Sequence, residues 1–181
     1  MKTQTEKILN VLRVIAWIGY VGSIAMTVIA GIFTIYSFIY PDADFIKNIT
    51  ISEAKLPFRT LKNDNLGRLI FYYILFLAKT YFVIKIWKLA KDALNNININ
   101  NPFSSKTSII LEKIAHLVIV LGVINFVIGQ YVFVLDGLVT DHIKYNFSPD
   151  LTYIFGIGII YLISQIFKRG VELQEENELT V

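Results

Sequence analysis

The sequence predicts an all-α integral membrane protein, a four-helix bundle with both chain ends on the cytoplasmic side. Hydrophobic residues make up 55% of its 181 residues and charged residues only 17%, whereas soluble domains carry about 25% charged residues. The missing charge falls in a few long charge-free stretches, which are typical of membrane spans. The length favours a single domain over residues 1–181, most of it in lipid.

The first predicted span covers residues 14–40. It contains no ionisable group other than tyrosine, and it exceeds the roughly 20 apolar residues that a helix needs to cross the hydrocarbon core. A secretory signal has a shorter apolar region, about 7–15 residues, and a small-residue cleavage site, which the sequence before Pro41 lacks. We therefore expect an uncleaved span that ends at this proline.

Three further spans are predicted at residues 69–89, 114–135 and 151–167. Lys79, Lys85 and Lys88 interrupt the second, whereas the third and fourth contain no charged residue. An acidic tail at residues 170–181 follows the fourth span.

The connections carry two local signals. Residues 101–104 read Asn-Pro-Phe-Ser and lead into Ser105. A serine oxygen after a proline can accept a free backbone N–H at a helix start, so we expect a helix that begins there and continues into the third span. The loop at residues 42–68 is long for a helical connection and has weak strand character at Asn48–Ser52.

Basic residues predict the orientation. The chain ends and the connection between the second and third spans carry ten lysines and arginines when Lys85 and Lys88, at the end of the second span, are included; the other two loops carry six. Cytoplasmic segments are enriched in these residues. We therefore expect both termini inside, in a multi-pass protein of the cytoplasmic (inner) membrane.

Several chemistries find no support in the sequence. Cysteine is absent, which removes disulfides and thiolate sites. His116 and His142 lie in different segments, which argues against a histidine metal site. Paired carboxylates and a nucleophile beside a base are also missing. We expect no enzyme activity, catalytic residue, metal or cofactor, and a lipid bilayer as partner without direct nucleic-acid contact.

Four polar residues are predicted to form a layer near the middle of the membrane. Lys79 lies about 12–15 Å from the inner end of its span at 1.5 Å per residue. Asn125, Ser23 and Thr27 fall at similar depth in their spans. No span contains a carboxylate, so a charged Lys79 would await an anionic ligand. In the alternative interpretation, Lys79 snorkels or bonds Asn125 or a backbone carbonyl.

Small residues recur at helix-packing spacing, and we expect them to allow close approach of neighbouring helices. The glycines concerned are Gly19, Gly22, Gly31, Gly122, Gly129, Gly156 and Gly158.

The C-terminal tail combines a basic start with an acidic end. Lys168 and Arg169 end the fourth span, and Glu172, Glu175, Glu176 and Glu178 follow before Val181. Anionic lipid would repel these glutamates. The tail is therefore either a solvated end or a docking peptide for a basic cytoplasmic partner.

Two segments carry a family resemblance. The Asn-Pro-Phe-Ser entry at residues 101–104 and the more specific ending Phe-Lys-Arg-Gly-Val-Glu-Leu-Gln-Glu-Glu-Asn-Glu-Leu-Thr-Val at residues 167–181 resemble the YoaS-like proteins. These are small bacterial membrane proteins of unknown function with four predicted spans. The resemblance covers chiefly the second half of the chain. It implies a gene neighbour encoding a small helix-turn-helix regulator, and it supplies no catalytic residues.

Three hypotheses about function follow. The first is a regulatory protein that docks a small DNA-binding regulator through the acidic tail and the basic middle connection. The second is a transport component with Lys79, Asn125 and Ser23 along a path, which would need a homo-oligomer because four short helices leave little room for water. The third and weakest is a lipid-modifying enzyme.

Overall fold

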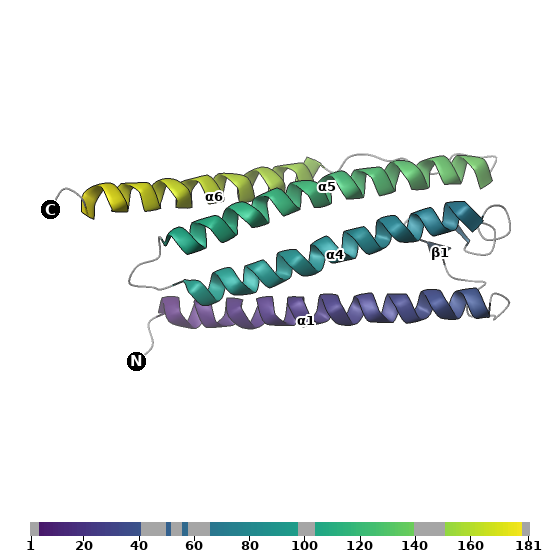
Figure 1. The fold of residues 1–181 in the computed structure, drawn as a ribbon, viewed down its shortest axis with the longest axis horizontal. Coiled ribbons are helices and arrows are strands. Elements are labelled where there is room, and N and C mark those ends of the chain that lie inside the picture. The colour runs from purple at the N-terminus through teal and green to yellow at the C-terminus, as the bar shows by residue number, and fades with distance from the viewer. Residues whose placement is uncertain are drawn as a thin grey trace. The chain divides into compact units, whose positions relative to one another are not determined.

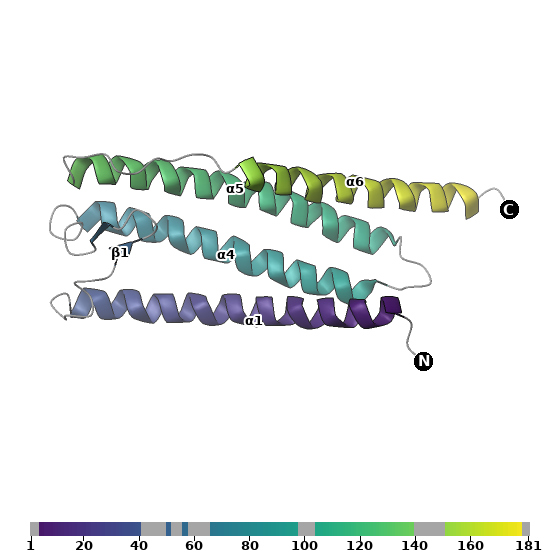
Figure 2. The same cartoon turned by 180° about the vertical axis from the view of Figure 1, so that it is seen from behind.

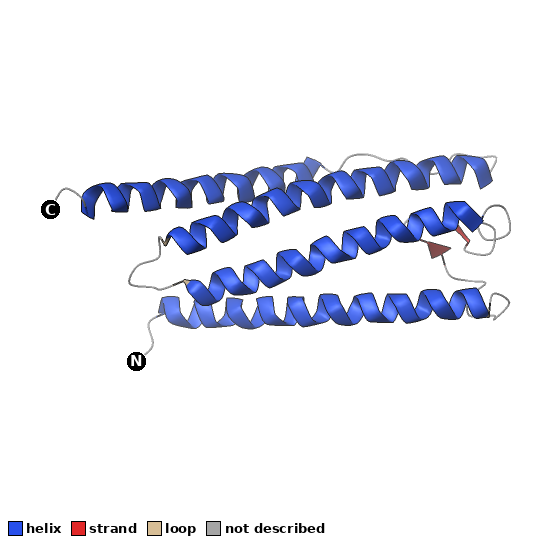
Figure 3. Ribbon diagram, viewed as in Figure 1, coloured by secondary structure: helices blue, strands red, loops and turns tan. Residues whose placement is uncertain are grey.

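In a computed structural model, the described residues form four α-helices and one short two-stranded sheet (Figures 1 and 3). The structure describes residues 4–40, 50–51, 56–57, 66–97, 104–139 and 151–178. The elements are α1 (Gln4–Ile39), β1 (Thr50–Ile51), β2 (Leu56–Pro57), α4 (Leu66–Asn96), α5 (Ser105–Val139) and α6 (Leu151–Glu178). The predicted all-α fold class is confirmed.

Three of the helices are long and apolar enough to cross a membrane. These stretches are Gln4–Tyr36, Leu66–Asn96 and Ser105–Val134. In the most apolar part of α1 no residue is buried, and in those of α4 and α5 only 11% are. Proteins in water rarely expose such continuous apolar surface. The apolar side chains therefore face outward, as expected where lipid covers them. The fourth predicted span, in α6, stays a prediction.

The helix ends follow local sequence signals. The last residue of α1 is Ile39, and the Tyr40 N–H still donates to the Tyr36 carbonyl at 2.9 Å. This end lies close to the predicted stop at Pro41. At the start of α5, the Ser104 hydroxyl oxygen accepts the backbone N–H of Thr107 at 3.2 Å. This bond satisfies one of the free N–H groups of the first turn. The predicted serine start is confirmed, and α5 continues through the third predicted span to Val139.

Part of the predicted strand is also confirmed. β1 pairs antiparallel with β2, with Thr50 opposite Pro57 and Ile51 opposite Leu56. These residues fall within the long first loop. Residues 66–68 of the predicted loop already belong to α4. Residues 42–49, 52–55 and 58–65, and the loop at residues 140–150, lie outside the described residues.

The contacts divide the chain into two compact units. Unit 1 contains α1 through Ile24, α4 from Phe82, α5 through Gly122, and α6. Unit 2 contains α1 from Ala25, the β1–β2 pair, α4 through Tyr81, and α5 from Val123. The prediction of one domain over residues 1–181 stays a prediction.

The buried residues of the two units differ in size. Those of unit 1 are mostly small, as expected for close packing of membrane helices: Ala16, Ala93, Thr107, Ser108, Ile114, Ala115 and Ser164. Apart from Gly129, those of unit 2 are larger: Leu69, Tyr72, Ile128 and Val132. In unit 2 the aromatic ring of Tyr72 thus takes part in the packing.

Candidate functional site

Lys79 lies on the inward face of α4 in unit 2. Leu69 and Tyr72 mark this face, because both are buried. Lys79 follows Tyr72 by about two helical turns, which returns it to the same side of the helix. Its side chain is half-buried. The opposite, exposed stripe of α4 consists of Ile70, Ile74, Leu77 and Tyr81. The lysine is therefore directed toward neighbouring helices and away from the lipid-facing stripe.

Thr27 lies at the depth of Lys79 within unit 2. There α1 and α4 run in opposite directions (Figure 1), and the Tyr73 hydroxyl is hydrogen-bonded to the Thr34 side chain. Thr27 precedes Thr34 by about two turns of α1, and Lys79 follows Tyr73 by about two turns of α4. Because the two helices are antiparallel, Thr27 and Lys79 lie at a similar level. Thr27 is half-buried as well.

Asn125 approaches the same depth from α5. The Tyr131 hydroxyl donates to the Arg68 carbonyl at 2.8 Å, and its ring meets Phe71 edge-on with centroids 5.0 Å apart. Lys79 follows Phe71 by about two turns of α4, and Asn125 precedes Tyr131 by nearly two turns of α5. Because α4 and α5 are antiparallel here, Lys79 and Asn125 lie within about one turn of the same level. Spacing in the sequence gave no signal for the Tyr131 hydrogen bond, because Arg68 and Tyr131 are 63 residues apart.

Ser23 differs from the other three predicted residues, because it belongs to unit 1. It precedes Thr27 by about one turn of α1, and its hydroxyl donates to the Tyr20 carbonyl of the same helix at 2.8 Å. That all four residues act as one polar layer stays a prediction.

The surroundings of Lys79 contain little negative charge. Among the described residues of unit 2 the single acidic residue is Asp136, near the far end of α5. Lys79 forms no hydrogen bond or ion pair with any residue that the structure describes. A lysine charge at the centre of a membrane helix costs at least about 2.5–3.5 kcal/mol. An anion beside Lys79 would reduce that cost.

In unit 1, an arginine joins α1 to the end of α4. The Arg13 guanidinium donates to the Leu94 carbonyl at 2.9 Å, to the Ile97 carbonyl at 3.3 Å and to the Asn10 side-chain oxygen at 3.3 Å. The last carbonyls of a helix lack intrahelical partners, so these bonds cap α4 from another helix. In the sequence, Arg13 is one of the basic residues counted at the chain ends, and its acceptors are more than 80 residues away.

Two more contacts join α1 and α4 in unit 1. Lys91 places its ammonium 4.7 Å from the ring centre of Tyr20, a cation–π distance. A Cβ atom on Gly19 would overlap the indole ring of Trp87, so the absence of a side chain at Gly19 is required there.

The expectation for the other glycines is only partly met. Among the described residues, a Cβ on Gly22, Gly31, Gly156 or Gly158 would meet no atom within 4 Å. These four glycines therefore provide no close helix contact in the part of the chain that the structure describes, and for them the prediction fails there. Spacing alone did not distinguish them from Gly19, because only the opposing helix decides which glycine is covered.

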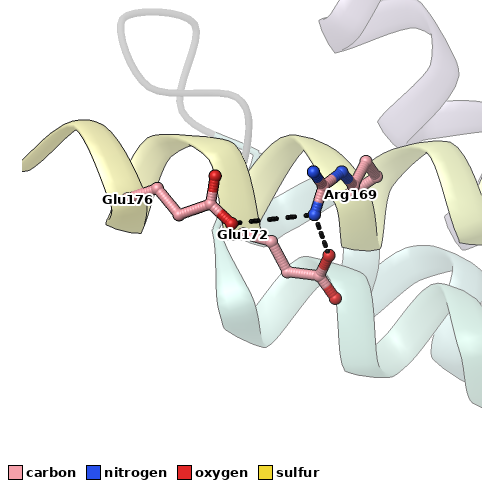
Figure 4. Close-up of polar contacts among 3 residues, drawn as sticks. All are labelled: Arg169, Glu172 and Glu176. Atoms are coloured by element: carbon pink, nitrogen blue, oxygen red, sulfur yellow. Dashed lines mark hydrogen bonds and ion pairs between the residues drawn. The ribbon is translucent and has the colours of Figure 1, made fainter.

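The acidic tail is largely helical. α6 continues without interruption past Phe167 to Glu178 (Figure 2). The Arg169 guanidinium lies 2.9 Å from a Glu172 carboxylate oxygen and 3.8 Å from one of Glu176 (Figure 4). The hydrogen bond to Glu172 and the nearby charge of Glu176 raise the pKa of Arg169 above its ordinary value. The guanidinium therefore remains charged across the physiological pH range.

The remaining glutamates of the tail differ from this cluster. Glu175 is exposed and has no ionic or hydrogen-bonding partner among the described residues. The Glu178 side chain and Val181 lie outside what the structure describes. The tail therefore presents the Glu175 carboxylate, which has no partner among the described residues. Next to it are Glu172 and Glu176, which share Arg169.

No metal centre is found in the described ranges, where no three histidine, cysteine, aspartate or glutamate residues lie together. The expectation of no metal, cofactor or catalytic residue stays a prediction.

Comparison with known proteins gives a family but no function. The family described as "Protein of unknown function (DUF2975)" matches residues 37–181. No curated protein and no solved structure matches the chain. The matched segment begins near the end of α1 and includes α4, α5 and α6 with its acidic tail. Because the match covers far more than half of the sequence, the chain belongs to the DUF2975 family of proteins of unknown function.

Proposed function

We propose that this protein is a regulatory membrane protein that docks a small, basic DNA-binding regulator on the C-terminal turns of α6. The observation that carries the proposal is the exposed, charged end of that helix. Glu175 and Glu176 are exposed there, and Leu173 is 45% exposed beside them. An exposed leucine next to carboxylates offers both apolar contact and charge to a partner.

The charge of these turns favours a basic partner. Residues 168–178 contain two basic residues and four glutamates, so the segment is net negative by two charges. Arg169 already neutralises part of Glu172 and Glu176, whereas Glu175 has no described partner. Complementary charge mainly accelerates encounter and selects the partner. Anionic lipid, in contrast, would repel the segment.

The helical state of the tail also supports docking. A segment that is ordered before binding loses less conformational entropy when a partner arrives. The turns beyond Phe167 already extend α6, so their side chains have defined spacing. A partner helix or groove could therefore contact side chains at regular spacing along one face of α6.

The proposal includes an orientation. The basic residues divide ten to six in favour of the chain ends and the middle connection, which supports cytoplasmic termini. Residues 151–167 would then form a fourth span of a four-helix bundle in the bacterial cytoplasmic membrane. In this arrangement the acidic turns of α6 emerge where a DNA-binding protein can reach them.

A pull-down from native membranes tests the proposal. We would compare the full chain with a chain truncated after Gly170 and identify the co-eluting proteins by mass spectrometry. A small basic DNA-binding protein should be lost on truncation, while membrane insertion and yield remain unchanged. A regulator retained equally by both chains would contradict the role of α6.

A matched pair of single substitutions sharpens the test. Glu175→Gln removes the one tail carboxylate with a described side chain that has no partner among the described residues. Loss of this charge should weaken regulator binding by a few-fold, in line with roughly 1 kcal/mol for one exposed charge pair. Lys88→Gln, an exposed cation of α4, is the control and should leave binding unchanged. Equal effects of the two changes would argue against a specific acidic surface.

A further inference from the structure

We propose that Lys79 binds the carboxylate of a long-chain fatty acid dissolved in the bilayer. The site lies within unit 2, with Lys79 on the inward face of α4 and Thr27 and Asn125 at nearby depth on α1 and α5. This inference does not depend on regulator docking, because it uses no residue of the α6 tail.

The position of Lys79 indicates that its ligand is anionic. Its side chain lies on the side of the buried Tyr72 and away from the exposed stripe of α4. The described part of unit 2 supplies Asp136 as its single acidic residue, and it lies toward the other end of α5. A carboxylate beside the ammonium would form a pair without net charge and with a strong charge-assisted hydrogen bond.

The depth of Lys79 indicates that this anion arrives through the lipid. Along α4, Lys79 lies about 20 Å from Leu66 and about 26 Å from Asn96 at 1.5 Å per residue. A water-soluble anion would have to shed its hydration shell to reach that depth. A phospholipid keeps its charged headgroup at the interface. A fatty acid, in contrast, can enter the bilayer interior in its neutral, protonated form, and its hydrocarbon chain is compatible with the surrounding apolar residues. On binding it transfers its proton to the neutral Lys79 amine, which gives the ammonium–carboxylate pair.

The neighbouring side chains suit a carboxylate. A threonine hydroxyl and an asparagine amide can both donate hydrogen bonds to carboxylate oxygens. Thr27 and Asn125 are half-buried on the helices adjacent to α4 in this unit. The proposed site therefore offers the carboxylate one charged donor, Lys79, and two neutral donors, Thr27 and Asn125. The helices that carry these residues are otherwise mostly apolar. Binding sites for amphiphiles combine polar and apolar surface in this way.

Photo-crosslinking of the intact protein tests the inference. The full chain would be placed in nanodiscs of zwitterionic phosphatidylcholine and labelled with a palmitic acid analogue that carries a diazirine and an alkyne. Labelling should be saturable, and mass spectrometry should locate adducts on α4 near Lys79. Palmitic acid should compete. Palmityl alcohol, which has the same chain length, should not compete because it lacks the carboxylate.

Variants identify the group responsible. Lys79→Met should reduce saturable labelling by about tenfold, the effect of losing one charge-assisted contact. Lys85→Met, at an exposed position on the same helix, should label like the natural chain. Truncation after Gly170 should also leave labelling unchanged, which separates this site from the docking proposal.

Each contrary result has a defined meaning. Equal competition by palmityl alcohol, or undiminished labelling of Lys79→Met, would overturn the inference. Competition by inorganic phosphate or by phosphatidylglycerol instead of palmitic acid would overturn the fatty-acid assignment. If Lys79→Met does not fold, the location of adducts and the acid-against-alcohol comparison in the natural chain still decide the result.

Discussion

Arg13 in α1 and Arg169 in α6 present the same side chain in contrasting surroundings. Arg13 is half-buried and donates to backbone carbonyls at the end of α4. Arg169 has 61% of its side chain exposed and pairs with carboxylates of its own helix. The first joins segments that are distant in sequence, whereas the second connects only neighbouring turns.

The difference indicates which contacts stabilise the fold and which remain available. Backbone carbonyls at a helix end lack intrahelical partners, so replacing Arg13 removes a donor that bonds them in a partly buried place. Exposed ion pairs contribute little, because water and salt compete with them. The α1–α4 contact of unit 1 is therefore expected to be structural, and the end of α6 to be a surface for interaction.

The largest expected effect comes from breaking the α1–α4 contact sterically. Gly19→Val would place its side chain in the volume of the Trp87 ring, and forcing extra atoms into a packed contact costs about 1–3 kcal/mol. The thermal unfolding midpoint in nanodiscs should fall. Gly22→Val, where the corresponding space is open, is the matched control. Equal midpoints for the two variants would mean that Gly19 is not covered by Trp87.

Arg13→Met should give the next largest effect. It preserves much of the apolar stem but removes the donors to Leu94 and Ile97, and hydrogen bonds to a charged group contribute about 1.5–3 kcal/mol. Unfolding in nanodiscs should therefore occur at lower temperature. Lys88→Met removes an exposed cation from α4, and changes of this kind stay within about 0.5 kcal/mol. The contrast between arginine and lysine would disappear if Arg13 acted only as surface charge.

Arg169→Gln should have the smallest effect on stability and an opposite effect on binding. The pair is exposed, so the unfolding midpoint should not change measurably. Glu172 and Glu176 would lose their shared cation, so affinity for a basic regulator should rise, and this gain should shrink at high salt. Titration of the purified regulator at two salt concentrations measures it. A clear loss of stability would place Arg169 in the same structural class as Arg13.

Local and compositional features of the fold were predictable from the sequence. A charge in hydrocarbon is costly, so charge-free runs mark α1 and α5, and an apolar run interrupted by three lysines marks α4. The structure shows all three stretches to be long and apolar. The Ser104 start of α5 was predictable because the serine and the N–H it accepts are separated by a single turn. Strand character near Thr50 was visible for a similar local reason, since β1 and β2 are close neighbours in sequence.

The candidate site was predictable only in part. The sequence placed Lys79 and Asn125 at mid-depth from their distances to span ends. It could not determine which side of α4 Lys79 occupies, because the face that packs inward depends on the neighbouring helices. The buried Tyr72 and the exposed Leu77 reveal that face only after folding.

The sequence by itself therefore determined the membrane character, the helix positions and the local cap, because solvent transfer and short-range hydrogen bonds act along one segment. Tertiary structure decided that Gly19 and not Gly22 packs against a ring, and that Arg13 caps α4. It also revealed that Tyr131 bonds the Arg68 carbonyl. Each of these depends on atoms contributed by a second helix, and no property of a single segment specifies which residues of that helix will lie opposite.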